Sequence, residues 1–301
     1  MVMYGYIEPD NKLVAYAPTE VAIQELYAGV ATIKPGMLVG RGADDSKCTL
    51  ATIGTAAVMP LGVAGYEQSF LGNSSYTSQR PATITTAYAS GAKVPILSGT
   101  NFVLPLKLAI GFASTKGDRL ASFTDGTVIP YIPVMGGFAI KIPFKKNATE
   151  KDTGIDLPAG VIVTGSFIEV TKNVATATVT VGLLSTEDNG DADGFIDGAS
   201  AASKGFVFPV NQAAAAASLT VGELISTDIK SGDTPAIFFA LPKSYVTDGV
   251  AKSITYTTSD HDIEGNIYIV CQATGMVDVG RAEKTVSAST SIQTQMAMVN
   301  I

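Results

Sequence analysis

The chain has 301 residues, of which 46% are hydrophobic and 16% are charged, and its mean hydropathy is +0.28. This balance is the opposite of the low hydrophobicity and high charge that keep proteins disordered, and the length is sufficient for two domains with a core each. So apolar a composition predicts that large surfaces are covered by partner molecules.

Charge is divided unevenly along the chain. Residues 1–150 contain 12 Lys and Arg against 10 Asp and Glu, whereas residues 151–301 contain 8 against 17. The acidic half should be repelled by nucleic acids and by anionic lipid surfaces. The alternative is that its acidic face only keeps this half soluble. We expect no nucleic-acid partner and no membrane partner.

Three further observations bear on where the protein is made. No apolar run reaches the roughly 18 residues that a membrane helix needs, and the first residues lack the basic and apolar parts of a secretion signal. The chain contains two cysteines, Cys48 and Cys271, which argues against a disulfide framework. These features predict synthesis in a reducing cytoplasm.

In chain order, short β-prone runs alternate with turn residues. The segment from Tyr4 to Tyr16 contains aromatic residues and a proline, and it predicts either an arm that adds to a neighbour's sheet or a frayed terminus. Short helices are allowed at residues 18–28 and 212–218, with a loop or arm as the alternative at each. Strand candidates lie at residues 93–97, 102–104, 137–142, 160–163 and 176–181. This rhythm is typical of an all-β sandwich or barrel.

Two further segments suggest how the chain is organised. Residues 144–152 are the densest charge cluster and have no apolar pattern, so they predict an exposed linker between two domains, 1–144 and 153–301. Residues 291–299 are uncharged and end in apolar residues. They predict an exposed strand that pairs within an oligomer.

The most distinctive stretch is an acidic, glycine-rich loop that follows a predicted strand. Asn189, Asp191, Asp193 and Asp197 match the first, third, fifth and ninth positions of a calcium loop, with Gly194 at the sharp turn. The register fails at the last position, where Ser200 replaces the bidentate Glu. The sequence therefore offers Ca²⁺ as a possible cofactor, and a plain Asx-Gly turn as the alternative.

No catalytic constellation is evident in the sequence. His261 is the only histidine and lies between Asp260 and Asp262, which allows a pH-sensitive group but equally a polar loop residue. No Gly-x-Ser-x-Gly elbow supports a hydrolytic triad, and the glycines around Arg41 lack the Lys-Ser/Thr ending of a phosphate-binding loop. We do not expect an enzyme, and a hydrolase is the weakest of the alternatives.

Five segments of the first half, in this order, resemble the capsid decoration and head-fibre proteins of tailed viruses. They are PGMLV at residues 35–39, PLGVA at 60–64, GAKVPI at 91–96, GDRL at 117–120 and DGTVIP at 125–130. The second half is similar to another module of virion proteins. Its segments are LPAGVIV at 157–163, FIEV at 167–170, VGLLS at 181–185, GDADGF at 190–195, KSITYT at 252–257 and GNIYI at 265–269.

The resemblance implies an all-β protein with an N-terminal barrel or β-tulip-like decoration domain and a C-terminal jelly-roll-like β-sandwich. It implies a virion protein of the capsid exterior, made in the host cytoplasm, that binds the major capsid protein. It further implies that homotrimers bridge capsomers of an icosahedral shell, with no catalytic residue. The alternative is a fibre or surface adhesin that binds host glycans.

Overall fold

The computed structural model describes residues 22–65, 85–134, 137–209, 212–213, 224–231, 237–242, 245–247, 249–259 and 261–301. Every regular element within these ranges is a β-strand, so the prediction of an all-β protein is confirmed. The chain forms two compact units. Unit 1 contains residues 1–130 and 275–301, and unit 2 contains residues 131–274.

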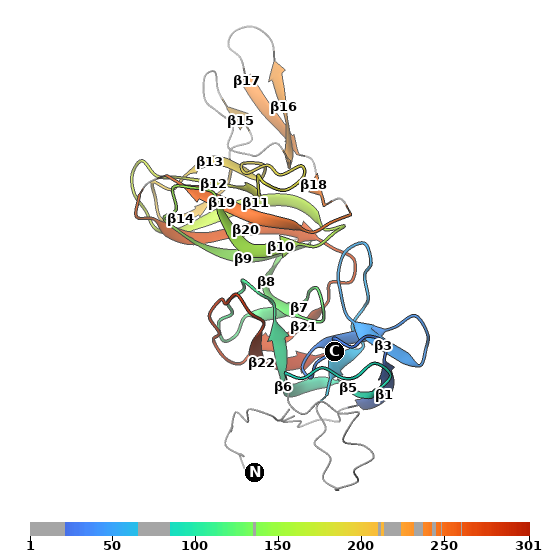
Figure 1. Cartoon of the computed structure of the whole chain (residues 1–301). Helices are drawn as coiled ribbons and strands as arrows, with labels where there is room; N and C mark the ends of the chain where they lie inside the picture. The colour runs from blue at the N-terminus through green and yellow to red at the C-terminus, as the bar shows by residue number, and fades with distance from the viewer. Residues whose placement is uncertain are drawn as a thin grey trace. The chain divides into compact units, whose positions relative to one another are not determined.

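Unit 1 begins with a small closed barrel (Figure 1). Its strands follow the order β1 (Ala22–Ala28), β3 (Lys47–Leu50), β2 (Leu38–Arg41), β4 (Gly62–Ala64) and β5 (Lys93–Ser98), and β5 closes the ring against β1. Short strands with a buried inner row suit a barrel of this size. That row includes Leu26, Val39, Cys48 and Val94, each at most 7% exposed.

The rest of unit 1 is a sheet in which the C-terminal strand lies inside. β22 (Gln293–Asn300) pairs with β6 (Thr100–Leu108) on one side and with β21 (Asp278–Ala282) on the other, and β21 also pairs with β7 (Arg119–Ser122). The expectation of an exposed C-terminal strand is therefore wrong, because both of its edges are already used within the chain.

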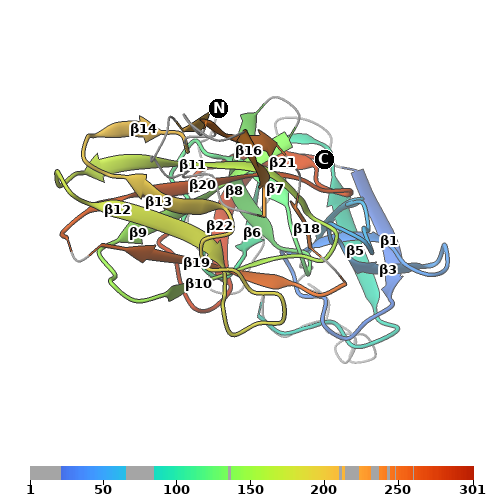
Figure 2. The same ribbon diagram turned by 90° about the horizontal axis from the view of Figure 1, so that it is seen from above.

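Unit 2 is a sandwich of two sheets. One sheet contains β9 (Gly137–Lys145), β20 (Glu264–Gln272), β11 (Ile162–Lys172) and β14 (Gly205–Val207) side by side, as Figures 1 and 2 show. The other follows the order β10 (Lys151–Leu157), β19 (Lys252–Thr258), β12 (Thr178–Leu183) and β13 (Ile196–Ser200).

Side chains from both sheets of unit 2 meet in one core. The ring of Phe144 on β9 contacts Tyr256 on β19 edge to face, with centroids 6.2 Å apart. The Ser166 hydroxyl on β11 donates to the carbonyl of Phe195, which precedes β13 (2.9 Å). Such face-to-face packing of alternating side chains is what holds a sandwich together.

Four smaller strands, and one strand that belongs to both units, complete the fold. β15 (Gln212–Ala213), β17 (Ile237–Pro242) and β16 (Ser226–Ser231) form a separate three-stranded sheet, and β18 (Tyr245–Val246) pairs with β11. β8 (Val128–Val134) begins in unit 1, where Val128 pairs with Leu108, and ends in unit 2, where residues 131–134 pair with β9.

Several sequence-based predictions differ from this arrangement. The helix allowed at residues 18–28 is strand β1 from residue 22 onwards, and residues 212–213 of the second helix candidate are strand β15. The linker predicted at residues 144–152 lies inside unit 2, where it covers the end of β9, the turn after it and the start of β10. The remaining residues of both helix candidates and the proposed arm at residues 4–16 lie outside the described residues.

Candidate functional site

The acidic loop connects β12 with β13 in unit 2, and buried residues hold both of its ends. Leu183 and Phe195 are each 0% exposed. The Leu183 N–H donates to the carbonyl of Asp191 (2.7 Å), and the Gly190 N–H donates to the carbonyl of Glu187 (2.9 Å). Asn189 has a positive φ of 54°, which this residue type tolerates well. The loop is thus a compact series of turns closed by its own backbone.

A buried lysine supplies a positive charge to this loop. Lys252 lies on the inner side of β19 and is only 2% exposed. Its ammonium donates a 2.5 Å hydrogen bond to the backbone carbonyl of Asp188. A buried ammonium is stable only when polar atoms surround it. The Asp188 carbonyl oxygen is such a partner, so a side chain of the protein supplies a positive charge to this loop.

Carboxylates at the base of the loop bind neighbouring backbone and hydroxyl groups. Glu187 accepts hydrogen bonds from the Ser253 N–H (3.1 Å) and lies within 2.6 Å of the Ser253 hydroxyl. Glu150 accepts a hydrogen bond from the Ser185 N–H (2.8 Å). These contacts attach the loop to β19 and to the segment before β10. Glu150 and Glu187 therefore stabilise the position of the loop.

The four residues predicted to bind calcium lie partly in the loop and partly on strand β13. Asp193 and Asp197 are exposed, and residues 196–200, which would form the second part of a calcium loop, are the extended strand β13. Among the described residues, no three or more His, Cys, Asp or Glu side chains are grouped so that they could hold a metal ion. Asn189, Asp191, Asp193 and Asp197 therefore remain a predicted calcium site only.

His261 lies in a bend before β20, half-buried. Its Nε2 is 2.9 Å from the hydroxyl of Thr176. The neighbouring Asp262 binds the ammonium of Lys172 (2.5 Å), and this ion pair lowers the pKa of Asp262 and raises that of Lys172. The Asp262 carboxylate, one of the two beside His261 in the sequence, is thus paired with Lys172.

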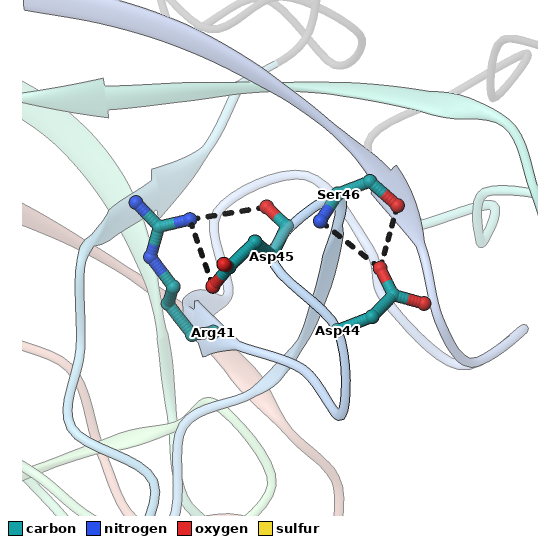
Figure 3. Close-up of polar contacts among 4 residues, drawn as sticks. All are labelled: Arg41, Asp44, Asp45 and Ser46. Atoms are coloured by element: carbon teal, nitrogen blue, oxygen red, sulfur yellow. Dashed lines mark hydrogen bonds and ion pairs between the residues drawn. The ribbon is translucent and has the colours of Figure 1, made fainter.

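The turn between β2 and β3 gathers opposite charges on the barrel surface (Figure 3). One Asp44 oxygen accepts from the Ser46 N–H (3.0 Å), and its other oxygen binds the Lys47 ammonium (2.8 Å). Arg41 donates to the carbonyl of Asp45 (3.0 Å). The hydrogen bonds from Lys47 and Ser46 lower the pKa of Asp44 to about 2. Arg41 therefore contacts the turn itself.

Both cysteines are buried, and their thiols are held in the protonated form. Cys48 lies in unit 1 and Cys271 in unit 2, and both are free thiols. Burial raises the pKa of the Cys48 thiol to about 11 and raises that of Cys271 as well. Because the thiolate is the nucleophile, neither group is prepared for catalysis at neutral pH.

Unit 2 also carries an aromatic surface that the sequence did not predict. Phe206 on β14 and Phe208 just after it are 59% and 66% exposed. They lie beside Phe167 and Tyr268 on the same sheet. Two phenylalanines two residues apart, next to glycine and proline, are the signal that could have indicated a strand with one aromatic face.

No described residue belongs to a helix long and apolar enough to cross a membrane. Comparisons with protein-family models, with curated proteins and with solved structures find no match to this chain. Function is therefore inferred from the two units and from their surfaces.

Proposed function

We propose that the protein is a virion structural protein that coats an icosahedral capsid and stabilises it by bridging capsomers as a homotrimer. It works by covering surface, without making or breaking covalent bonds. Burial of apolar area contributes roughly 25 cal/mol per Å². A modest contact that is repeated over a whole shell therefore adds up to a large resistance against internal pressure.

The observation that carries the proposal is the place of the five capsid-decoration segments in the fold. Segments 35–39, 60–64 and 91–96 contribute to the barrel strands β2, β4 and β5. Segments 117–120 and 125–130 contribute to β7 and β8. All five lie in unit 1. Each segment alone is a weak resemblance, but together they belong to one folded module.

Two motif glycines have a physical reason within that module. Gly36 and Gly126 have φ values of +85° and +69°, and a Cβ atom on either would lie 2.6 Å from a backbone oxygen. A residue with a side chain would be strained in both respects. These motif positions therefore reflect the way the barrel and the neighbouring sheet are joined.

Charge supports an orientation on the shell. Unit 1 contains 11 Lys and Arg and 11 Asp and Glu, whereas unit 2 contains 9 and 16. The whole net charge of -7 is thus in unit 2. A neutral unit can approach another protein without strong self-repulsion, and an acidic unit favours solvent. In our proposal, unit 1 contacts the capsid and unit 2 faces outwards.

Unit 1 also offers apolar side chains for such a contact. Ile23 and Tyr27 on β1 are 67% and 45% exposed. Because they are four residues apart on one strand, they lie on the same face. We propose that this face contributes to the contact with the major capsid protein.

Quantitative mass spectrometry of purified particles tests the function. We expect a copy number that approaches that of the major capsid protein. Only a few copies per particle would favour the alternative of a glycan-binding fibre, and absence from particles would refute both.

The orientation is tested by co-sedimentation of the full chain with capsids that lack it. We expect the double substitution Ile23→Thr and Tyr27→Thr to weaken binding roughly tenfold or more. The matched control is Val246→Thr with Val250→Thr, two valines of unit 2 that are 53% and 58% exposed. If the control loses binding and the unit 1 variant keeps it, the orientation is reversed.

A further inference from the structure

The outer face of the larger sheet of unit 2 carries a cluster of four aromatic rings. Phe167 on β11 and Tyr268 on β20 are cross-strand partners, and their rings stack with centroids 4.7 Å apart and planes 14° apart. Phe208 lies 5.2 Å from Phe167, and Phe206 lies 6.0 Å from it. The cluster faces away from the core, because the alternate residues Ile168 and Ile267 are the fully buried ones.

Two of the four rings, those of Phe206 and Phe208, are exposed to solvent. Tyr268 is 2% exposed and Phe167 is half-buried, so these two rings form a base. Phe206 and Phe208 stand over that base with more than half of their surface exposed. A soluble protein rarely leaves neighbouring aromatic rings exposed unless they bind something.

Two polar side chains beside the rings, Glu169 and Asn266, are fixed by hydrogen bonds and each keeps a further acceptor oxygen. Oε2 of Glu169 accepts hydrogen bonds from the Tyr268 hydroxyl and from the Asn266 side-chain amide, both at 2.8 Å. Both residues, Glu169 and Asn266, are half-buried. In the described part of the chain, no hydrogen bond uses Oε1 of Glu169 or Oδ1 of Asn266.

This combination restricts the chemistry of the ligand. An apolar protein surface would cover the rings but would leave the acceptor oxygens without partners, which is unfavourable. A nucleic acid could stack its bases, but its phosphates would be repelled by Glu169 and by the acidic unit. A pyranose has a flat face of C–H groups for the rings and hydroxyl groups that donate to the oxygens.

We propose that Phe206, Phe208, Glu169 and Asn266 form a binding site for an uncharged hexose of a glycan. The exposed rings stack on the C–H face of the sugar, and the Glu169 and Asn266 oxygens accept its hydroxyl hydrogens. Few, well-placed polar groups beside an apolar surface are the usual composition of a small-ligand site. This activity goes beyond coating a capsid and does not depend on it.

The test uses the purified full chain and the methyl glycosides of glucose, galactose, mannose and N-acetylglucosamine. Saturation-transfer NMR should show contact with at least one of them, strongest at the C–H protons of one sugar face. We expect Phe208→Ala to weaken that binding roughly tenfold. Glu169→Gln should also weaken it, because a charged acceptor becomes a neutral amide.

The control is Val246→Ala, another exposed apolar position beside β11, which should bind like the unchanged protein. The proposal is overturned if none of the four glycosides binds, or if Phe206→Ala and Phe208→Ala leave binding unchanged. It is also overturned if these rings instead hold two copies of the chain together. In that case sedimentation would show an assembly that Phe208→Ala disperses, with no sugar contact. None of these outcomes bears on the copy number in particles.

Discussion

At the scale of single residues, Lys252 decides how the acidic loop is stabilised. Its ammonium is buried against the Asp188 carbonyl. We expect Lys252→Met, which keeps the length of the side chain, to destabilise unit 2 by about 1–3 kcal/mol, because the Asp188 carbonyl loses its hydrogen bond from a charged donor. Calorimetric melting measures this change, and hydrogen exchange at the amides of residues 183–194 should rise with it.

Lys172→Met is the matched control for that substitution. Lys172 also pairs with an acidic partner, Asp262, but on the exposed surface, where ion pairs contribute little. We expect no measurable change in melting. Equal melting of the Lys252 and Lys172 variants would contradict a structural role for the buried ammonium.

A second residue-scale prediction concerns pH. The pKa of Asp44 is lowered to about 2 from 3.8, chiefly by its bond with Lys47. A lowered carboxyl pKa contributes stability that is fully present above pH 3.8 and is lost as the pH falls towards 2. In Lys47→Met, the pKa of Asp44 should move back towards 3.8, as NMR titration of its carboxyl carbon would measure. Arg41→Met should leave it near 2, because Arg41 contacts Asp45 instead.

At the scale of elements, short β-prone runs between turn residues predict strands well. Local helix propensity is misleading where pairing with a strand far away in the sequence determines the secondary structure. Residues 93–97 and 137–142 are strands, as expected. β1 has the composition of a helix, but it pairs with β5 from Ala22↔Ser98 to Tyr27↔Lys93. Those pairs close the barrel, and their free energy outweighs a weak preference for helix.

In the candidate site, too, contacts between sequence neighbours can be predicted, whereas contacts between residues far apart in the chain cannot. The acidic loop can be predicted from the sequence because its turns are formed by residues that are neighbours in the chain. Lys252 is 64 residues from its partner Asp188, and Phe206 is brought beside Tyr268 only by the order of strands β14, β11 and β20. Neither contact can be derived without knowing the strand order.

At the scale of the whole molecule, unit 1 is assembled from both ends of the chain. β22 pairs with β6 from Gln293↔Leu108 to Asn300↔Thr100, so the last strand completes a sheet that begins nearly 200 residues earlier. Unit 2 is a continuous insertion between these parts. A charge cluster at residues 144–152 cannot reveal such a boundary, since it covers the end of β9, the turn at residues 146–150 and the start of β10 within unit 2.

This discontinuity predicts how fragments behave. Residues 131–274 contain both sheets of unit 2, including the eight register pairs of β20 with β9, and we expect them to melt cooperatively on their own. Residues 1–144 lack β21 and β22, so the edge of β6 is left unpaired and apolar. We expect this fragment to show no cooperative transition in calorimetry and to aggregate.

Residues 153–301 are the informative comparison, because they begin at the boundary that the charge cluster suggests. This fragment lacks β9, the partner of β20, and it carries β22 without β6. It should therefore melt less cooperatively than residues 131–274 although it is slightly longer. If residues 1–144 and 153–301 both melted cooperatively while residues 131–274 did not, the chain would divide at its charge cluster. The pairing of β22 with β6 would then contribute little to the stability of unit 1.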